Sequence, residues 1–431
     1  MKSIKSLLRS YLPKGLIDRY KYLHYLGGVR YELLHKNRIR AIRRKGNANV
    51  LFISSSLPMW RYQGIYDLLE ADSRFKVAIM IAPFPTFSER EQAYSVEQLQ
   101  QYFASKGIMA ITAPENSGDL KRWLDDFNPD IMFYPQNYEH LYGSPLDSDY
   151  FFDRLLCYYD YALPTVGASW NYNTVFNNLA WRHYIPTQFH KATLRRLAYN
   201  CDRNSRIVGE PHADLFFRSD TKNPWKPVSD GVRRKRVIFA PHFRIQNKGV
   251  FRRGAFQWMA DEMIELAERY KDRIQFAFKP HPRLFSELER LDSWGYEKSI
   301  SYYEKWATMP NTQLEIGDFI ELFNTSDAII HNCGSFTGEY LFTAKPALFV
   351  TKDLDIVKKD ADEFGRVCLD LHYKAHSMED VEEFISSVVL SGNDPMKSER
   401  EIFRENNLVP PGTGNVAMNT YLDILKGLKF I

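Results

Sequence analysis

Short β-rich runs alternate with polar, helix-compatible stretches along most of the chain. In the first half the runs cover residues 49–54, 76–81, 108–112 and 130–134, and residues 117–127 have the pattern of a helix between strands. Strands that alternate with helices in this way favour a parallel sheet covered by helices. The pattern therefore predicts an α/β fold.

A second series of the same kind begins after a break. Residues 219–235 are charged and contain Pro224 and Pro227, a composition typical of a linker. The strand-like runs that follow are residues 237–240, 274–278, 328–331 and 347–350, and the clearest helical pattern covers residues 254–270. We expect two Rossmann-like domains, residues 46–218 and 236–431, with a ligand cleft between them.

The amino-terminal 45 residues carry an unusual charge. They hold 13 Lys and Arg against two acids, a net charge of +11, whereas the rest of the chain carries −7. Apolar residues also recur at helical spacing within this segment: Ile4, Leu7, Leu8, Tyr11 and Leu12. We interpret residues 1–45 as a basic amphipathic segment that lies on an anionic membrane surface. The alternative is a helix packed on the body of the protein, with its basic face in solvent.

Other partners and compartments fit less well. No basic stripe interleaved with aromatic residues continues beyond residue 45, so nucleic acid is disfavoured. The longest apolar run, residues 77–82, is far shorter than the roughly 20 residues of a membrane span. The cysteines are not arranged as C-x-x-C pairs, which fits a reducing compartment; they are Cys157, Cys201, Cys333 and Cys368. We expect a cytoplasmic protein held peripherally on the inner face of the membrane.

Several common catalytic signatures are missing from the sequence. It contains no G-x-x-x-x-G-K-[ST], no G-x-G-x-x-G after a strand, no H-E-x-x-H and no G-x-S-x-G. P-loop hydrolysis, dinucleotide redox chemistry and serine hydrolysis are therefore disfavoured. Two D-x-D sequences, at Asp147 and Asp149 and at Asp353 and Asp355, have a form that can hold a divalent metal, but such pairs are common on surfaces. We assign no metal ligand.

Polar residues follow three strand-like runs of the second series. His242 and Arg244 follow residues 237–240, and Lys279 and His281 follow residues 274–278. Residues 328–331 run into a Gly-Ser turn, with Gly334, Ser335 and Thr337 at the start of a predicted helix. Ligands of α/β domains bind at the carboxyl ends of strands.

Together these residues suit a diphosphate. Cations and histidines make charge-assisted hydrogen bonds to phosphate oxygens, and free amides at a helix start favour anions. Taken singly, each feature also has a structural explanation, because a histidine at a strand end often serves as a cap and Gly-Ser often only begins a helix. The convergence of three strand ends is what predicts a phosphate-bearing ligand.

Four blocks of sequence resemble the CDP-glycerol glycerophosphotransferases of teichoic acid and capsule assembly. The blocks are I-V-G-E-P-H-A-D at 207–214, A-P-H-F-R at 240–244, F-K-P-H-P at 278–282, and D-F-I-E-L-F-N-T-S-D-A-I-I-H-N-C-G-S-F at 318–336 followed by E-Y-L-F-T-A-K-P at 339–346. The resemblance implies a two-domain GT-B fold and a membrane-associated enzyme. It also implies transfer of a polyol phosphate from a CDP-linked donor to a hydroxyl of a lipid-linked or growing polymer.

The resemblance also supplies an expected site. The donor would be bound by Arg244, Lys279, Asn332, Gly334, Ser335, Phe336, Thr337 and Gly209. Many members carry the histidine of an H-G-T motif in the first domain, and residues 158–169 of this chain contain none. Asn332 stands where the family often has an aspartate. Asp160 or His242 would therefore take the proton from the acceptor, while His281 would donate a hydrogen bond or proton at the phosphate.

Three functions remain open from sequence alone. The first is the polyol-phosphate transfer just described, which relies on positioning and electrostatics, so that no cofactor is required and a divalent metal is optional. The second is a GT-B glycosyltransferase that uses a nucleotide sugar, because the same diphosphate site serves both reactions. The third is a non-catalytic scaffold of polymer assembly at the membrane, motivated by Asn332 and the missing first-domain histidine.

Overall fold

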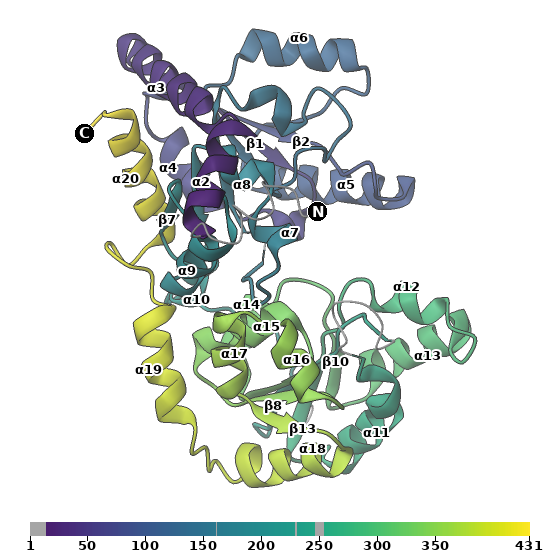
Figure 1. The fold of residues 1–431 in the computed structure, drawn as a ribbon. Helices are drawn as coiled ribbons and strands as arrows, with labels where there is room; N and C mark the ends of the chain where they lie inside the picture. The colour runs from purple at the N-terminus through teal and green to yellow at the C-terminus, as the bar shows by residue number, and fades with distance from the viewer. Residues whose placement is uncertain (1–13, 161, 229–230, 246–253) are drawn as a thin grey trace, which may run out of the picture. The chain divides into compact units, whose positions relative to one another are not determined.

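The computed structural model describes residues 14–160, 162–228, 231–245 and 254–431, and the chain forms two compact units (Figure 1). The first unit contains Met1–Ala162, Ala168–Ala213 and Val409–Ile431, and the second contains Leu163–Gly167 and Asp214–Leu408. Each unit is built on one parallel β-sheet. The predicted α/β fold with two parallel-sheet domains is thus confirmed. The predicted apolar stripe from Ile4 to Leu12 lies outside the described residues.

The first unit has a seven-stranded sheet of order β3-β2-β1-β4-β5-β6-β7. Its strands are β1 (Ala48–Ser54), β2 (Phe75–Ile81), β3 (Ala110–Thr112), β4 (Ile131–Tyr134), β5 (Leu155–Tyr159), β6 (Arg182–Ile185) and β7 (Ser205–Ile207). Its helices are α2 (Lys14–His24), α3 (Gly28–Lys45), η1 (Leu57–Met59), α4 (Gln63–Glu70), α5 (Glu89–Ser105), α6 (Ser117–Phe127), η2 (Ser148–Phe151), α7 (Ser169–Tyr172), α8 (Val175–Leu179), α9 (Gln188–Leu197) and α20 (Val416–Leu428).

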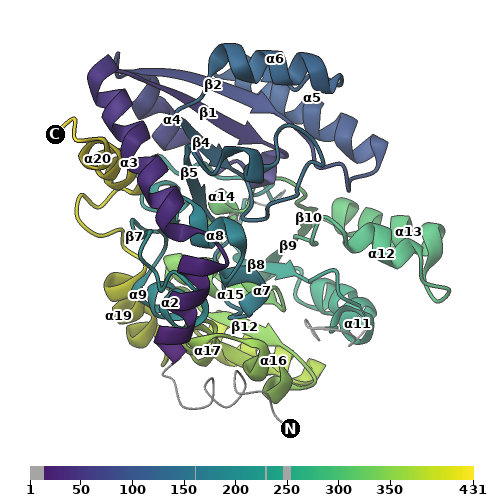
Figure 2. The same cartoon turned by 45° about the horizontal axis from the view of Figure 1, so that its top comes forward.

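Local sequence explains these elements. The residues of β4 and β5 are all buried, as expected for a central parallel strand that is covered on both faces (Figure 2). The helix predicted at residues 117–127 is α6. Its cap, Asn116, accepts hydrogen bonds from the amides of Gly118 and Asp119, and its buried residues, Leu120, Leu124 and Phe127, recur at helical spacing.

The second unit has a six-stranded sheet of order β10-β9-β8-β11-β12-β13. Its strands are β8 (Lys235–Ala240), β9 (Ile274–Phe278), β10 (Thr312–Leu314), β11 (Ala328–His331), β12 (Ala347–Val350) and β13 (Tyr373–Ala375). Its helices are α11 (Phe256–Arg269), α12 (Leu284–Glu289), α13 (Gly295–Thr308), α14 (Ile320–Thr325), α15 (Gly334–Glu339), η3 (Tyr340–Thr343), α16 (Leu354–Asp360), α17 (Glu363–Asp370), α18 (Met378–Phe384), η4 (Ile385–Leu390) and α19 (Lys397–Asn407); α10 (Ala213–Phe216) begins at the boundary between the units.

The units do not divide where the sequence pattern placed the domain boundaries. Residues 409–431 lie in the first unit, although the pattern assigned all of 236–431 to the second domain. The described part of the predicted linker, residues 219–235, packs on the second unit. There Trp225 is buried, its indole N–H donates to Thr325 Oγ1 over 3.0 Å, and Gln275 and Gln313 donate to backbone carbonyls of the same stretch.

Candidate functional site

The three polar segments of the second unit follow three neighbouring strands. His242 follows β8, His281 follows β9, and Asn332 follows β11. In the sheet, β8 lies between β9 and β11, with Phe239 paired to Phe278 and Ala240 paired to His331. The strand order reverses direction between β8 and β11, and this switch point is where open α/β sheets bind ligands. The structure therefore brings the predicted segments together at one edge.

Hydrogen bonds fix the two histidines. The amide of His242 donates to Asn332 Oδ1 over 2.7 Å, and the amide of His281 donates to the carbonyl of Pro241 over 3.1 Å. The centroids of the two imidazole rings are 5.1 Å apart. Asn332, buried beneath, thus links the β11 turn to the β8 turn.

Two further hydrogen bonds determine which ring nitrogen of each histidine carries the proton. His242 Nδ1 accepts the amide of Arg244, and His281 Nδ1 accepts the amide of Arg283, both over 3.1 Å. A neutral imidazole that accepts at Nδ1 carries its hydrogen on Nε2. Burial, reinforced by the charge of Arg283, lowers the pKa of His281 to about 4, so this ring is neutral at pH 7. His281 therefore offers an Nε2–H donor, which suits an oxyanion.

Lys279, the lysine that the sequence suggested, already has a hydrogen-bond partner within the second unit. Lys279 is only 7% exposed, and its Nζ donates to the carbonyl of Gly317 over 2.5 Å; burial lowers the pKa of this ammonium group. Arg283, one residue beyond the quoted F-K-P-H-P block, is exposed. Its guanidinium carbon lies 4.6 Å from the ring centroid of Phe243, and that of Arg244 lies 5.2 Å from the same centroid. Sequence reasoning missed Arg283, although its position after a strand-end histidine was visible.

The residues of the Gly-Ser turn have different surroundings. Ser335 is half-buried, and its hydroxyl forms no hydrogen bond within the described part of the chain. The Thr337 hydroxyl is buried and donates to the carbonyl of Cys333 over 2.9 Å, so it supports α15 from inside. Phe336 packs against Phe319 and Phe323 of the α14 region. Ser335 and the amides at the start of α15 are thus the groups of this turn that can face a ligand.

A short segment, Leu163–Gly167, packs with the second unit at this turn. The Thr165 hydroxyl donates to the carbonyl of Gly334 over 3.2 Å, and the Thr165 carbonyl accepts the amide of Asp362 over 3.0 Å. Leu163–Gly167 therefore packs with the second sheet, although it lies between strands of the first. This is the stretch in which the family resemblance pointed to an H-G-T motif.

Asp160 lies in the first unit, directly after β5. Its Oδ2 is 3.5 Å from Nε2 of His183, a residue of the neighbouring strand β6 that is 1% exposed. The Asp160 side chain is only 9% exposed, and neither of these two atoms forms a hydrogen bond among the described residues. The pair is a carboxylate held beside an imidazole at the carboxyl edge of the first sheet. His183 was not expected from sequence.

Gly209, which the resemblance assigned to the donor site, lies close to the carboxyl-terminal segment. It belongs to the first unit, has a φ of +104°, and a Cβ there would come within 2.8 Å of Val416. Packing and backbone conformation therefore account for this glycine.

The D-x-D aspartates mostly serve turns and caps. Asp147 accepts the amides of Tyr142 and Gly143, and Asp353 caps α16 by accepting the amide of Ile356. His140, Asp147 and Asp149 place one ligand atom each within 4.8 Å of one another, and no ion is needed to explain the turn.

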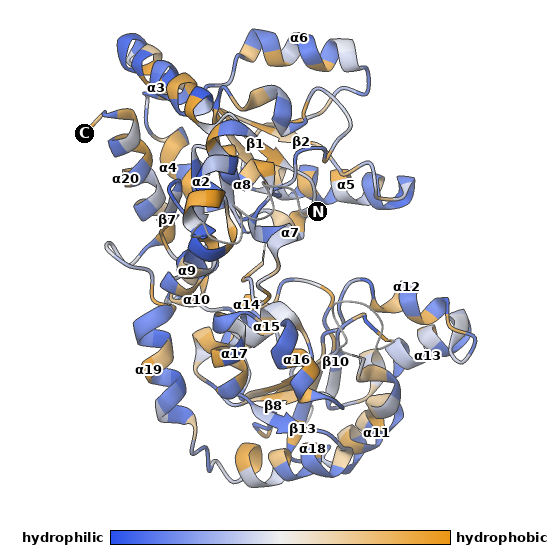
Figure 3. Cartoon of the chain, in the orientation of Figure 1, coloured by the Kyte–Doolittle hydropathy of each residue, from blue (hydrophilic) through white to orange (hydrophobic). Residues whose placement is uncertain are grey.

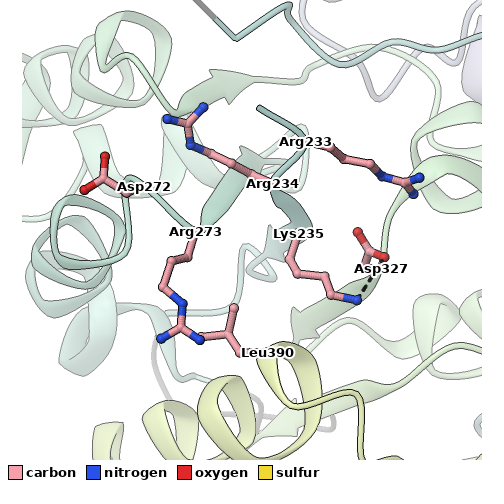
Figure 4. Close-up of a pocket in the computed structure, with 7 residues that line it drawn as sticks. All are labelled: Arg233, Arg234, Lys235, Asp272, Arg273, Asp327 and Leu390. Atoms are coloured by element: carbon pink, nitrogen blue, oxygen red, sulfur yellow. Dashed lines mark ion pairs between the residues drawn. The ribbon is translucent and has the colours of Figure 1, made fainter. Parts of the chain in front are cut away.

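A hollow of about 480 Å³ lies at the opposite, amino-terminal edge of the second sheet (Figure 4). It is lined by Arg233, Arg234, Lys235, Asp272, Arg273, Asp327 and Leu390. The arginine side chains point away from one another, and the ammonium of Lys235 lies 3.8 Å from Asp327. The charged side chains of this hollow do not converge on a common point where a ligand could bind. The switch-point edge is therefore the better candidate site.

Comparisons with known proteins identify a family and solved structures of similar fold. The family described as CDP-glycerol:poly(glycerophosphate) glycerophosphotransferase matches residues 167–407. No curated protein matches the chain. A solved variant of the wall teichoic acid polymerase TagF is 13% identical, with a TM-score of 0.58 over 96% of this chain and 98% of that one. UDP-GlcNAc 2-epimerase from Neisseria meningitidis, bound to UDP-GlcNAc, is 16% identical, with a TM-score of 0.58 over 88% of this chain and 100% of that one.

Proposed function

The chain belongs to the CDP-glycerol:poly(glycerophosphate) glycerophosphotransferase family, and from that premise we propose its reaction. It transfers a polyol phosphate from a CDP-linked donor to a hydroxyl of a lipid-linked or polymeric acceptor in the synthesis of a teichoic-acid-like surface polymer. The acceptor oxygen forms a bond to the phosphorus that bears the polyol, the bond from that phosphorus to the bridging oxygen breaks, and CMP leaves.

One observation carries this proposal. Imidazole donors and exposed guanidiniums follow adjacent strands at the switch point of the second sheet. Arg244 and Arg283 would neutralise the donor diphosphate, and the Nε2–H groups of His242 and His281 would donate to its oxygens. Ser335 and the first amides of α15 would bind a further oxygen. Such preorganised donors supply most of the catalysis of phosphoryl transfer, so a metal is optional.

The proton of the acceptor hydroxyl needs a different group. The Nε2–H tautomer leaves His242 without a free basic nitrogen, because Nδ1 already accepts the amide of Arg244. We therefore assign the general base to Asp160, with His183 beside it to hold the carboxylate. This assignment offers a replacement for the histidine of the H-G-T motif.

The membrane part of the proposal rests on charge. Residues 1–45 carry a net charge of +11, and no described helix of the structure could span a bilayer. We propose that the enzyme acts peripherally on the inner face of the membrane, where a lipid-linked acceptor would be found.

A donor panel tests the reaction. The purified chain is incubated with CDP-glycerol, CDP-ribitol and UDP- and GDP-sugars, together with a membrane acceptor fraction, and the released nucleotide is identified. Release of CMP from a CDP-polyol supports the proposal. Release of UDP or GDP from a sugar donor would mean cleavage at sugar carbon, the reaction of a glycosyltransferase. Binding of donors without any release would favour a scaffold.

A glycosyltransferase reaction is the second candidate function, because a solved protein with a similar fold binds a nucleotide sugar. The Neisseria epimerase shares the fold and binds UDP-GlcNAc, so a nucleotide-sugar donor is sterically compatible with such a fold. The panel separates the two reactions through the number of phosphates on the released nucleotide.

A further inference from the structure

The hollow at the amino-terminal edge of the second sheet gathers positive charge from two neighbouring strands. Arg233, Arg234, Lys235 and Arg236 lead into β8, and Arg273 directly precedes β9. The two segments lie side by side, because the amide of Lys235 donates to the carbonyl of Arg273 over 3.0 Å and the strands pair from this point. The interior of β8 is apolar, so the charged residues mark the end of the strand (Figure 3). We call these five residues the basic edge.

Carboxylates offset only part of this charge. Two of them line the same hollow. Oδ2 of Asp327 accepts the amide of Arg236 over 2.8 Å, and its Oδ1 lies 3.8 Å from Nζ of Lys235. Arg233 and Arg273 are exposed, and neither forms an ion pair within the described part of the chain. The basic edge therefore keeps a net positive charge.

The cations of the basic edge repel one another in the free protein. The pKa of Arg236 is lowered, chiefly because its side chain is partly buried and further because the charge of Arg233 is near. The guanidinium carbon of Arg236 lies 5.5 Å from the ring centroid of Trp225, which covers one of its faces. Like charges held together cost free energy, and a bound anion recovers that cost.

The arrangement suits an extended anion rather than a compact one. The side chains of Arg233, Arg234 and Arg273 point away from one another, so a single phosphate cannot contact all three (Figure 4). A chain that carries a phosphate in every repeat can contact them in turn. The residues that line the hollow are charged apart from Leu390, so the lining offers no ring on which a nucleic-acid base can stack.

The proposed reaction involves a chain of this kind. A polymer of glycerol phosphate carries one negative charge in every repeat. Where the terminal hydroxyls of glycerol are linked, it has as many backbone bonds between phosphates as a single strand of nucleic acid. Cations bind the phosphates of such a strand by charge alone and release its counterions.

The basic edge lies opposite the edge at which the donor would bind. Strand β8, Lys235–Ala240, has six residues, and His242 follows its far end. At about 3.3 Å per residue, the two edges are about 20 Å apart. A polymer whose growing end lies at the donor phosphate therefore reaches the basic edge only if it is longer than about 20 Å. Contact there distinguishes long acceptors from short ones.

We propose that the basic edge binds the phosphodiester backbone of the growing polymer while the end of that polymer is extended at the opposite edge of the second sheet. The proposal rests on the proposed function and adds a second contact surface for its acceptor. A contact remote from the reacting end raises the effective concentration of a long acceptor at the site and so lowers its KM.

Transfer to acceptors of two lengths tests the surface with the full chain. CMP release from CDP-glycerol is measured with a glycerol phosphate polymer and with a single-repeat acceptor. Arg233→Gln combined with Arg273→Gln should raise KM for the polymer about tenfold. KM for the single-repeat acceptor, KM for CDP-glycerol and kcat should not change. Lysine at the same two positions should keep KM for the polymer low, because lysine also binds phosphate as a point charge.

Direct binding of an end-labelled glycerol phosphate polymer gives a second readout. Affinity of the unmodified chain should fall as salt rises, and the double glutamine variant should reduce the slope of log affinity against log salt by about 0.7 per lost phosphate contact. Lys106→Gln combined with Lys298→Gln is the matched control. It removes the same charge from exposed positions outside the hollow and should behave as the unmodified chain does.

Unchanged KM for the polymer in the double glutamine variant would overturn the proposal. An equal rise of KM in the double lysine variant would overturn it as well, because the arginines would then have a structural role. Tighter binding of an oligonucleotide or a phosphatidylglycerol vesicle to the basic edge would assign this surface to another partner. If the unmodified chain releases no CMP even with the single-repeat acceptor, the proposed reaction fails, and the polymer-binding measurement still decides whether the basic edge binds the polymer.

Discussion

At the scale of single residues, the candidate site is determined by which atoms of each side chain are already engaged. His281 uses Nδ1 to accept a backbone amide and keeps Nε2–H for a ligand. The ammonium group of Lys279 donates a hydrogen bond to a backbone carbonyl, whereas Arg283 is exposed at the same turn. Sequence alone could locate the turn, but it could not show how each cation is engaged. Lys279 bonds to Gly317, whereas the exposed Arg283 pairs with Glu287 over 3.0 Å and lies over the ring of Phe243.

The first prediction concerns His281. His281→Ala should lower kcat for CMP release by about 10² to 10⁴, and His281→Gln should recover part of the loss because an amide N–H can replace the Nε2–H donor. Because the pKa of His281 is about 4, its protonation should not affect the rate between pH 6 and 8. Unchanged kcat in His281→Ala would contradict the role.

The second prediction compares two cations of one turn. Arg283→Gln should raise KM for the CDP donor by roughly tenfold, because a charge-assisted phosphate contact is lost. Lys279→Met should instead lower thermal stability, since the carbonyl of Gly317 loses the hydrogen bond that the buried Lys279 donates. The measurements are initial rates and thermal unfolding of both variants. The opposite assignment, with KM changed only in Lys279→Met, would show that Lys279 moves to the ligand.

The third prediction concerns Asp160 and His183. Asp160→Asn should lower kcat by about 10² to 10⁴ with little change in KM, as expected for a lost base. His183→Phe keeps the ring beside Tyr158 but removes the imidazole nitrogen, so it should lower kcat less. His183→Gln, which restores a donor, should recover part of that loss. If Asp160→Asn transfers at the normal rate, the base is another group.

At the scale of elements, the sequence pattern located the strands that carry the site. The runs at 237–240, 274–278 and 328–331 correspond to β8, β9 and β11, because fully buried strands are continuous apolar runs. The pattern missed β5, whose sequence, Leu155–Tyr159, is rich in tyrosine, the four-residue strand β6, and the three-residue strands β7, β10 and β13. Such short strands hold too few residues for a periodic signal. Residues 219–235 have the composition of a linker. A single buried tryptophan among prolines and charged residues gives no periodic pattern that would indicate packing.

The fourth prediction tests whether Leu163–Gly167 packs with the second unit. Gly365 lies within α17, where alanine normally stabilises a helix by up to about 1 kcal/mol. A Cβ on Gly365 would instead come within 2.2 Å of the Thr165 carbonyl oxygen. Gly365→Ala should therefore destabilise the protein, whereas Gly15→Ala in α2, with open space around it, should not. Thermal unfolding of both variants checks the sign; stabilisation by Gly365→Ala would mean that residues 163–167 do not pack there.

At the scale of the whole molecule, the fold and the enzyme family could be inferred from sequence, whereas the division of the chain into units could not. Alternating strands and helices predict two parallel sheets, and the four blocks that resemble the family predict its identity. The return of Val409–Ile431 to the first unit depends on long-range packing. There α20 buries Val416 and Ile424, and Gly64 of α4 lies so close to it that a Cβ would meet Ala417 at 2.8 Å. An amphipathic helix at a chain end has the same pattern whichever sheet it covers.

The last prediction follows from several buried histidines distributed over both units. Burial is the main cause that lowers the pKa of His35 and of His281 to about 4, and it lowers the pKa of His372 well below its ordinary value. In the unfolded chain these groups titrate near pH 6.5. The stability they contribute is therefore complete above about pH 6.5 and is lost as the pH falls toward 4, because the unfolded state takes up protons that the folded state does not.

His35 and His281 should each lower the free energy of unfolding by about 1 to 2 kcal/mol between pH 7 and 5, and His372 should act in the same direction. Chemical denaturation at several pH values measures this slope. His35→Gln, whose amide can still donate to the Phe152 carbonyl that His35 Nε2 contacts over 3.0 Å, should reduce the slope by the contribution of one proton. A stability that is flat from pH 7 to 5 would mean that these histidines become protonated within the folded protein.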